Sequence, residues 1–386
     1  MNGRLIPVRD ISAADERRWR QLAERAIDAN PLGEPDCVIP AARYQEFGSE
    51  IVLAVVEHQD RFVASLPLRP FRYWYDIHYP IIANRIRRGA NMASPLLDPD
   101  FAPEAAESLF TTLARERRHL GHLLGLDSLR VGSPVERLLL DTAQRMGLRT
   151  YIREDFERGF LVRRPNGDYT GHLNYKYLWN VRSRRRRIAA HFDSGPVLRD
   201  RAQDTRALDE FVELEASGYK AGNVALTAVP GDPQYFCEMC TRFARDRRLH
   251  LLSLEAGGIT LAMLIWLRAG DGFLQLKTAY DERYRCFGPG IILQIDSFSF
   301  FHEQTDGSWI DTCASPNNDT FLKLFPDRTR ISTILFSLGG RVDAMIVGNM
   351  QRIFPAQRLV RAWGSPFKRV AKRIVSQRGS HLSLAE

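Results

Sequence analysis

Hydrophobic and polar positions repeat along the chain with helical and strand periods. Apolar residues three or four positions apart predict helices, and short runs rich in Val, Ile, Tyr and Phe predict strands. In the first part of the chain the pattern predicts, in order, a helix over Ala13–Asp28, strands over Glu50–Glu57, Arg61–Leu68 and Phe71–Ile77, a helix over Pro103–Leu120, a strand over Ser128–Val131, and a helix over Ser133–Met146 that Gly147 ends.

A strong turn signal, Pro165-Asn166-Gly167-Asp168, precedes a second set of elements. This set comprises a basic helix from about Tyr175 to His191, helices Thr205–Ser217 and Pro233–Arg248, strands Leu249–Leu254, Ile259–Arg268 and Phe273–Tyr280, a helix from about Gly290 to Gln304, a strand Trp309–Cys313, a helix near Asp319–Phe325 and a strand Ser332–Leu338. A helix pair, a three-stranded meander, a helix and a strand thus occur twice. We expect two copies of one α+β unit, residues 1–165 and 166–350, followed by a basic tail, 351–386.

Composition supports a globular chain of about this organisation. The chain has 386 residues, which suits two domains, and its 44% hydrophobic and 26% charged residues exclude a disordered or disulfide-stapled class. No apolar run approaches the roughly 18 residues of a membrane span. The first residues lack a hydrophobic signal core, so we expect a cytoplasmic protein.

Candidate metal ligands are few. Cys237 and Cys240 form a lone CxxC, but they fall within the predicted helix Pro233–Arg248, where two cysteines on its buried side are the simpler interpretation. His119 and His122 lie in a basic run without an acidic partner in sequence. We therefore expect no metal site.

The most informative segment joins a strand to a helix. Arg285-x-x-Gly288-x-Gly290 follows the strand Phe273–Tyr280 and opens the next helix. Glycines let the backbone approach a ligand closely, and a helix start offers free N–H groups with a positive dipole end. Together with Arg285, this pattern indicates a pyrophosphate cradle. A plain helix start with Gly-Pro-Gly as its turn is the alternative.

The same segment resembles the acetyl-CoA signature of GNAT acetyltransferases. The surrounding residues are similar to one branch, the cellulose-biosynthesis-associated CelD/BcsL-type acetyltransferases. The matching pieces are Glu213–Lys220, Leu276–Glu282, Phe287–Gly290 and the basic run Arg182–Arg187. One departure is Tyr219-Lys220-Ala221, where the family usually has Trp-Lys-Gly.

The resemblance extends more weakly to the first half. Proteins of this kind carry a degenerate GNAT-like copy there, in the tandem organisation of FemAB-type peptidoglycan transferases. Consistent with this, Arg85–Gly89 lacks the second glycine of the signature.

The resemblance also implies the layout of a site. The strand end would pair with the pantetheine of acetyl-CoA through Lys277, Thr278 and Ala279. The remaining cofactor-binding residues would be Arg285 and the amides of Gly288, Gly290, Ile291 and Ile292. Candidate catalytic residues are Glu215 or Asp281 as the base and Tyr280 as the acid. Candidate acceptor-binding residues are Tyr219, Lys220, Asp311 and Asn317.

Simpler interpretations of these side chains stay open. Glu215 could be a solvated helix carboxylate, Asp281 a turn cap, and Tyr280 a packing residue. Lys220 could instead contact the 3′-phosphate of the cofactor.

The net charge of +8, with a pI near 9.4, resides largely in two segments. Arg182–Arg187 holds five arginines in six positions, and could be solvated or contact the CoA phosphates, an anionic acceptor or a membrane. The tail 351–386 has the composition of a basic interfacial helix, so peripheral membrane contact is a hypothesis beside a docked helix pair. Neither a zinc-finger nor an RRM pattern is present, and we expect no DNA partner.

We therefore expect tandem GNAT-like domains in which the second copy transfers an acyl group from acetyl-CoA or another acyl-CoA. The acceptor would be an amine or hydroxyl, plausibly on a sugar or exopolysaccharide precursor. One alternative is a FemAB-like aminoacyl transferase that uses charged tRNA. Another is a non-catalytic GNAT-like binding protein.

Overall fold

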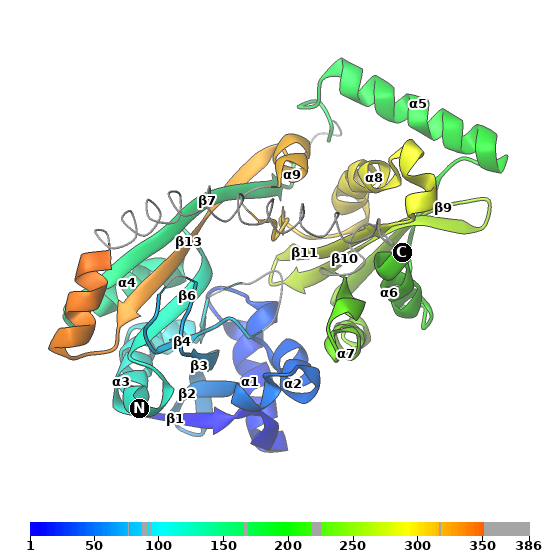
Figure 1. Cartoon of the computed structure of the whole chain (residues 1–386). Coiled ribbons are helices and arrows are strands. Elements are labelled where there is room, and N and C mark those ends of the chain that lie inside the picture. The colour runs from blue at the N-terminus through cyan, green and yellow to red at the C-terminus, as the bar shows by residue number, and fades with distance from the viewer. Residues whose placement is uncertain are drawn as a thin grey trace, which may run out of the picture.

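A computed structural model describes residues 1–75, 77–86, 92, 94–165, 169–217, 225–315 and 318–350. Most of the predicted helices and strands occur in the expected order, together with others that the sequence pattern did not predict, and Figure 1 shows their arrangement. The first half contains β1 (Asn2–Pro7), α1 (Ala13–Arg25), α2 (Pro35–Tyr44), β2 (Val52–His58), β3 (Arg61–Phe71), β4 (Ile81–Ala83), β5 (Leu96–Leu97), α3 (Ala102–Leu120), β6 (Leu123–Arg130), α4 (Pro134–Arg145) and β7 (Thr150–Val162).

The second half repeats this order after one additional helix. It contains α5 (Tyr175–Phe192), β8 (Val197–Asp200), α6 (Ala207–Ser217), α7 (Asp232–Arg245), β9 (Leu249–Ala256), β10 (Ile259–Ala269), β11 (Gly272–Tyr280), α8 (Pro289–Gln304), β12 (Trp309–Asp311), α9 (Asp319–Leu324) and β13 (Asp327–Ser337). Short 3-10 helices are η1 (Val8–Asp10), η2 (Pro31–Gly33), η3 (Gly48–Glu50), η4 (Pro99–Phe101), η5 (Leu226–Ala228) and η6 (Glu282–Phe287). Residues 341–350 are helical as well.

The described strands form one continuous sheet through both halves. Their order is β1-β2-β3-β4-β6-β13-β7-β12-β11-β10-β9-β8, and β5 pairs with β3 beside this path. The pairs β4–β6 and β11–β12 are parallel, whereas the other pairs are antiparallel. The predicted α+β class with a mixed, mainly antiparallel sheet is confirmed.

The two halves exchange their last strands. β13, from the second half, lies between β6 and β7 of the first half, and β7 pairs in turn with β12 of the second half. The predicted division at residue 165 stays a prediction, but sheet pairing crosses it in both directions.

Helices cover both faces of the sheet. α3 and α4 pack on the strands of the first half, and α5 and α8 cover one face of β9, β10 and β11. The opposite face of these strands packs against α6 and α7, and residues of α1 and α2 belong to the same apolar cluster. Among the described helices, none combines the length and hydropathy that crossing a bilayer requires.

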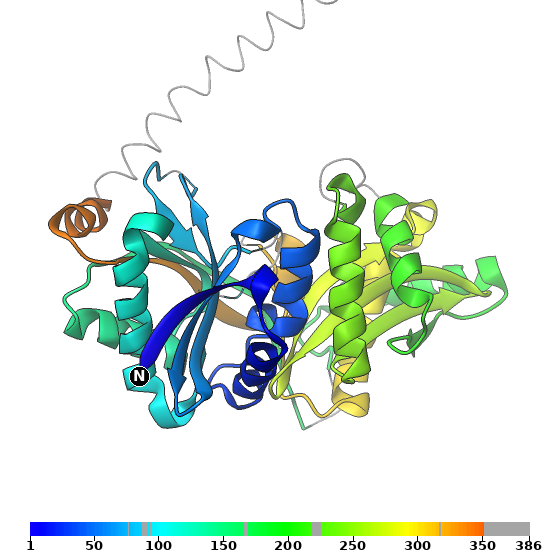
Figure 2. The ribbon, with the colours of Figure 1, turned by 90° about the horizontal axis from the view of Figure 1, so that it is seen from below.

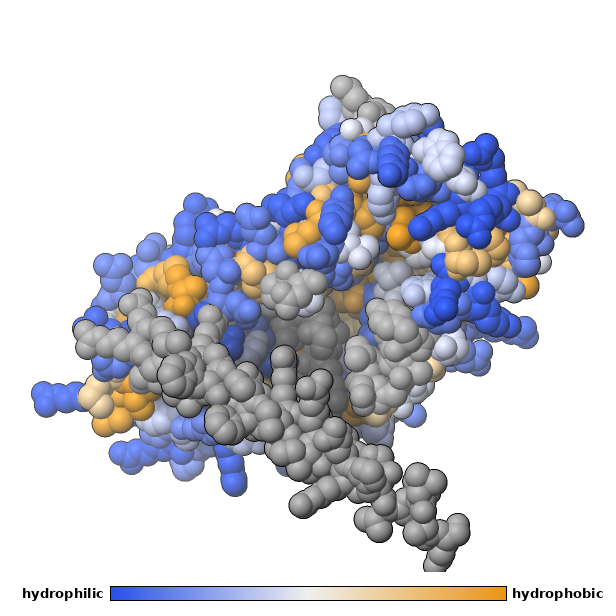
Figure 3. Space-filling model, turned by 45° about the horizontal axis from the view of Figure 1, so that its top comes forward, coloured by the Kyte–Doolittle hydropathy of each residue, from blue (hydrophilic) through white to orange (hydrophobic). Residues whose placement is uncertain are grey.

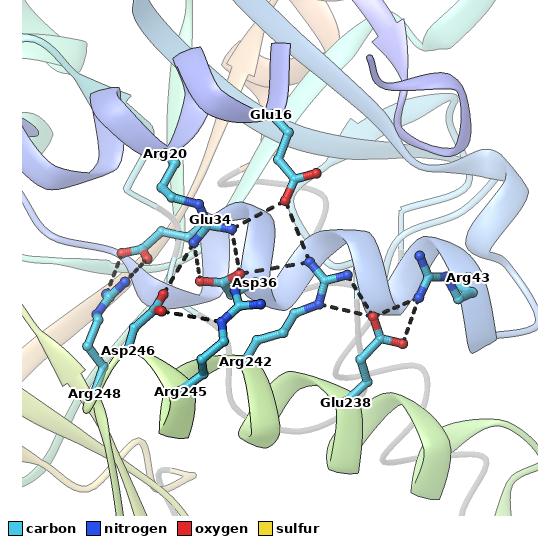
Figure 4. Close-up of polar contacts among 10 residues, drawn as sticks. All are labelled: Glu16, Arg20, Glu34, Asp36, Arg43, Glu238, Arg242, Arg245, Asp246 and Arg248. Atoms are coloured by element: carbon cyan, nitrogen blue, oxygen red, sulfur yellow. Dashed lines mark hydrogen bonds and ion pairs between the residues drawn. The ribbon is translucent and has the colours of Figure 1, made fainter. Parts of the chain in front are cut away.

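A shared core and an ion-pair network join the halves where α2 packs against α7 (Figure 2). Trp19 and Cys37 from the first half lie in one apolar cluster with Phe236 and Phe243 from the second. Around this cluster, alternating arginines and carboxylates connect α1, α2 and α7 (Figure 4). Arg248, for example, contacts Glu34 at 2.6 Å.

The predicted strand Phe71–Ile77 is wrong. β3 continues to Phe71, and the next strand is β4, Ile81–Ala83. Between them, Trp74 and Ile77 form only an isolated bridge, because Tyr75 adopts a left-handed conformation (φ 53°) that bends the chain. The alternating aromatic residues that suggested a strand pack at a bend instead.

Candidate active site

The site begins where two parallel strands separate. β11 pairs with β12 only between Gly272–Leu274 and Trp309–Asp311. Beyond these residues, β11 continues to Tyr280, whereas β12 ends. A wedge therefore opens in the sheet between the end of β11 and the segment after β12.

A β-bulge in β11 lies beside this wedge. Ile265 of β10 pairs with Lys277 and Trp266 pairs with Gln275, so Leu276 is an extra residue in β11. The bulge turns the Lys277 side chain toward α6, where it meets Glu215, while Gln275 faces α8 and bonds Gln294. Bulges bend a strand and redirect its side chains, which is why they are frequent at functional sites.

The backbone of β11 presents hydrogen-bonding groups to the wedge. The N–H of Asp281 donates to Leu261 on β10. Since successive residues of a strand direct their backbone groups to opposite edges, the N–H and C=O of Thr278 and Tyr280 face the wedge. The predicted strand end is thus placed to pair with an extended ligand.

A cavity of about 860 Å³ occupies the wedge, and helices from both faces of the sheet contribute to its lining. Its walls come from β11, the start of α8, the end of α6, and α9. Hydrophobic side chains show in the recess below the hydrophilic surface of α5 (Figure 3). Most of the predicted site residues line this cavity, namely Glu215, Lys277, Thr278, Ala279, Tyr280, Arg285, Gly288, Gly290 and Ile291.

The glycine loop forms the α8 end of the cavity. Gly288 is the N-cap of α8 with φ 61°, a conformation that favours glycine. A Cβ on Gly290 would lie 3.5 Å from Cδ1 of Tyr280, so a larger side chain would enter the cavity. The Cβ alone makes ordinary van der Waals contact, so only a side chain larger than that of Ala would block this end of the cavity.

The first turn of α8 offers fewer free amides than expected. Ile291 and Ile292 donate their N–H groups to the carbonyl of Gly288, at 3.1 and 3.3 Å, and Ile292 is fully buried. Pro289 has no N–H. The Gly290 amide is therefore the first-turn donor whose partner must come from outside the helix.

Two guanidinium groups line this end of the cavity, from Arg285 on η6 and from Arg184 on α5. The Arg184 side chain lies directly against the loop, since a Cβ on Gly288 would come 2.2 Å from its Nη1 atom. Together with the α8 dipole, these charges favour an anionic ligand.

The opposite end of the cavity contains a buried carboxylate. Glu215, in the last turn of α6, is 2% exposed and forms an ion pair with Lys277. Its other oxygen accepts the N–H of Leu226 at 2.7 Å. The alternative interpretation of Glu215 as a solvated helix carboxylate is wrong, because the side chain is buried at the cavity wall.

The first half contributes to this end as well. Gln45, at the end of α2, lines the cavity and donates to Asp232 at 3.2 Å. Asp232 is the first residue of α7 and also lines the cavity. Residues from both halves therefore line this end of the cavity.

Asp281 lies outside the cavity wall. It caps η6 and accepts hydrogen bonds from the Arg283 guanidinium, the shortest at 2.6 Å, and from the Arg283 amide. The bond from the Arg283 side chain lowers the pKa of this carboxyl, despite the opposing effect of burial. This geometry favours the turn-cap interpretation, and a base role for Asp281 has no geometric support.

Asp311 is fully buried away from the cavity wall. Its carboxylate contacts Arg158 of β7 at 2.6 Å and accepts the N–H of Cys313 at 2.9 Å. The side chain thus links β12 to the exchanged strand β7, and an acceptor-binding role has no geometric support. Tyr219, Lys220 and Asn317 lie outside the described residues.

The corresponding wedge of the first half is bridged by side chains. β4 and β6 pair in parallel only up to Ala83 and Gly125. Just beyond, Asn84 bonds the backbone of Asp127 in both directions, at 2.8 and 3.3 Å. Trp74 packs against Gly125, where a Cβ would lie 3.0 Å from its ring. These contacts are consistent with the expected degenerate copy.

The sequence analysis offered the run Arg182–Arg187 as a possible contact of the CoA phosphates but did not single out Arg184, and it did not consider Gln45. Val181, Arg184 and Ile188 repeat at helical spacing, and Val181 and Ile188 are buried, so this spacing could have placed Arg184 on the packed side of α5. Nothing in the local sequence marks Gln45, because its position depends on how the halves pack. Among the described residues, no cluster of His, Cys, Asp or Glu is arranged to hold a metal ion.

Comparisons with known proteins agree with this geometry. Residues 176–317 match the family described as "Acetyltransferase (GNAT) domain". A comparison with curated proteins gives no match. The fold is similar to the crystal structure of FemX, at 10% identity and a TM-score of 0.57, with 87% of this chain and 97% of that chain covered.

A second similar structure is the C-terminal domain of a putative lysylphosphatidylglycerol synthetase from Agrobacterium fabrum. It is 11% identical with a TM-score of 0.52, and 88% of this chain and 96% of that chain are covered. At these identities the likeness concerns the fold. The described residues adopt a GNAT fold, and the segment that matches the acetyltransferase family contains most of the cavity wall.

Proposed function

We propose that the protein transfers an acyl group from an acyl-CoA, in the first instance acetyl-CoA, to an amine or hydroxyl acceptor. One observation carries this proposal. The wedge between β11 and β12 leads from the glycine loop and two arginines at one end to a buried Glu215–Lys277 pair at the other. An extended thioester with an anionic end matches this path.

The chain would act mainly by holding the reactants together. The backbone of Thr278 and Tyr280 would pair with the pantetheine, and the Gly290 amide, Arg184 and Arg285 would bind the phosphates. An acyl-CoA supplies the activated thioester. The acceptor would enter from the α6 side and reach the thioester through the wedge.

Proton transfer falls to Glu215 and Tyr280. As the acceptor attacks the thioester carbonyl, Glu215 would take its proton, since each carboxylate oxygen keeps a lone pair beyond its present partner. Lys277 and the Leu226 amide hold the carboxylate in place. The C–S bond then breaks, and Tyr280, at the α8 end, would give a proton to the leaving thiolate.

A sugar or exopolysaccharide precursor is the acceptor class that the CelD/BcsL resemblance suggests. Release of free thiol from acetyl-CoA, measured while amino sugars and sugar hydroxyls are added in turn, tests both the transfer and the acceptor. Thiol release that depends on one acceptor class supports the proposal. Acetyl-CoA binding without release to any acceptor would favour a non-catalytic binding protein.

One observation favours a second candidate, an aminoacyl transferase that uses charged tRNA. On the outer face of α5, Tyr175 is 75% and Trp179 49% exposed, beside the exposed Arg182 and Arg186. Exposed aromatic rings among arginines can bind RNA by stacking and charge. Transfer of a labelled amino acid from charged tRNA, with no use of any CoA ester, would support this candidate over the first.

Peripheral membrane contact through residues 351–386 remains a proposal from the sequence, because these residues lie outside the described part of the chain. Co-sedimentation with anionic vesicles, with and without residues 351–386, tests it. Equal binding by both proteins would remove the tail from consideration.

A further inference from the structure

α5 lies beside the cavity, although it precedes the strands of the second half. In Figure 1 it crosses above α8. Val181 and Ile188 of α5 are buried in the apolar cluster that includes Phe287 and Ile292. Arg184 falls between them in the helical repeat, so its side chain points to the same side.

Two flanking arginines fix α5 against the start of α8. Arg185 pairs with Asp296 of α8 at 2.6 Å. Arg187 lies 5.3 Å above the ring of Phe287, close to the glycine loop. Between these two anchors, Arg184 is held against Gly288 at the cavity wall.

Within the described residues no carboxylate forms an ion pair with Arg184, although the Glu282 carboxylate lines the same cavity. Among the ion pairs between described residues, none involves Arg184 or Arg285. Both cations line the end of the cavity where the positive end of the 16-residue helix α8 lies. Guanidinium groups bind phosphate oxygens strongly and with defined geometry.

We propose that Arg184 binds the diphosphate of the acyl donor, so that α5 selects donors carried on a diphosphate over donors carried on one phosphate or none. This inference rests on the proposed use of acyl-CoA. Two guanidinium groups and the Gly290 amide offer donors to several oxygens at once. A diphosphate has enough oxygens to engage all three, whereas pantetheine has no phosphate to engage any of them.

Calorimetry on the full chain tests this proposal with CoA, dephospho-CoA, 4′-phosphopantetheine and pantetheine. The variant is Arg184→Gln, and the matched control is Arg186→Gln, on the exposed side of the same helix. We expect Arg184→Gln to weaken binding of CoA and dephospho-CoA by about 10- to 100-fold, as loss of a charged hydrogen bond does. The effect on 4′-phosphopantetheine should be smaller, and pantetheine should bind both variants as it binds the wild type.

Several results would overturn the assignment. Equal losses in the two variants would show that Arg184 acts only through net charge, and an equal loss with pantetheine would show a structural effect. A loss with CoA but not with dephospho-CoA would assign Arg184 to the 3′-phosphate instead. Arg184→Lys keeps the charge and should restore part of the affinity, which guards against a folding defect in the Gln variant.

The same measurements distinguish failure of the proposed acyl-CoA function from failure of the proposed role of Arg184. If the wild type binds no CoA compound, the acyl-CoA function falls and this inference falls with it. If the wild type binds CoA and Arg184→Gln binds it equally well, only the role of Arg184 is lost.

Discussion

At the scale of single residues, two carboxylates that the sequence offers as alternative bases occupy different environments. Glu215 is buried at the cavity wall between Lys277 and the Leu226 amide. Asp281 is tied to Arg283 in a turn outside the cavity wall. Composition and spacing could not show which of the two carboxylates lies at the cavity, because the burial of Glu215 depends on the β11 bulge that directs Lys277 toward it.

Replacing the Glu215 carboxylate should reduce turnover. In Glu215→Gln we expect kcat to fall by about 10²-fold or more, because the variant keeps the shape but cannot accept the proton. The matched control is Glu213→Gln, two residues earlier on the exposed side of α6, which should keep wild-type kcat. Steady-state kinetics decides, and equal rates for both variants would exclude Glu215 as the base.

The contrasting prediction concerns Asp281. Asp281→Ala should leave kcat within about twofold of wild type, and should cost about 1 kcal/mol of stability through the lost cap. Because Arg283 lowers the pKa of this carboxyl, its contribution to stability is present above the unfolded-state pKa and is lost as the pH falls through the folded-state pKa. A large loss of kcat without loss of stability would return Asp281 to the catalytic site.

At the scale of elements, the exchanged strands β7 and β13 depend on a buried ion pair. Arg158 on β7 is 2% exposed and pairs with the fully buried Asp311 on β12. Arg158→Met would leave the buried carboxylate with Arg130, 4.0 Å away, as its remaining ionic partner. Removing one partner of a buried ion pair typically costs about 3–5 kcal/mol, and we expect a loss toward the lower end of this range. Urea unfolding measures this loss.

The matched control lies in the same part of the sheet. Arg330 of β13 pairs with Asp155 of β7 at the surface, with side chains 58% and 37% exposed. Arg330→Met should therefore leave the unfolding free energy close to that of the wild type, because exposed ion pairs contribute little. A similar loss in both variants would contradict the account of the buried pair.

The sequence predicts the elements of the second half better than their pairing. Strands β9 to β11, helix α8 and the glycine loop follow from local patterns, and the structure confirms them. The exchange of β7 and β13 could not be predicted, because hydrophobic alternation shows that a strand has a buried face but does not identify its neighbour. The prediction of a strand over Phe71–Ile77 is wrong because aromatic residues occur both in strands and at packed bends. Here they pack at a bend where Tyr75 has a positive φ.

At the scale of the whole molecule, the exchange makes the halves mutually dependent. Removing either half takes one strand from the sheet of the other and exposes the core that α1, α2, α6 and α7 share. We therefore expect one cooperative thermal transition, with calorimetric and van't Hoff enthalpies in agreement. Two separate transitions in differential scanning calorimetry would show that the halves are independent.

The two halves contribute differently to the wedge between β11 and β12. Only the second half carries the glycine loop, while the first half supplies Gln45 to the cavity and bridges its own wedge with Asn84 and Asp127.

The central claim is that the wedge between β11 and β12 binds an acyl-CoA. Calorimetry with acetyl-CoA tests it most directly, using the wild type, Gly290→Ala and Gly290→Trp. A Cβ at Gly290 makes only ordinary contact with Tyr280, so the Ala variant is the folded control, whereas the Trp side chain would fill the cavity. We predict micromolar binding to the wild type, little change in Gly290→Ala and no binding to Gly290→Trp. The absence of wild-type binding to any CoA ester, together with binding to charged tRNA, would contradict the claim.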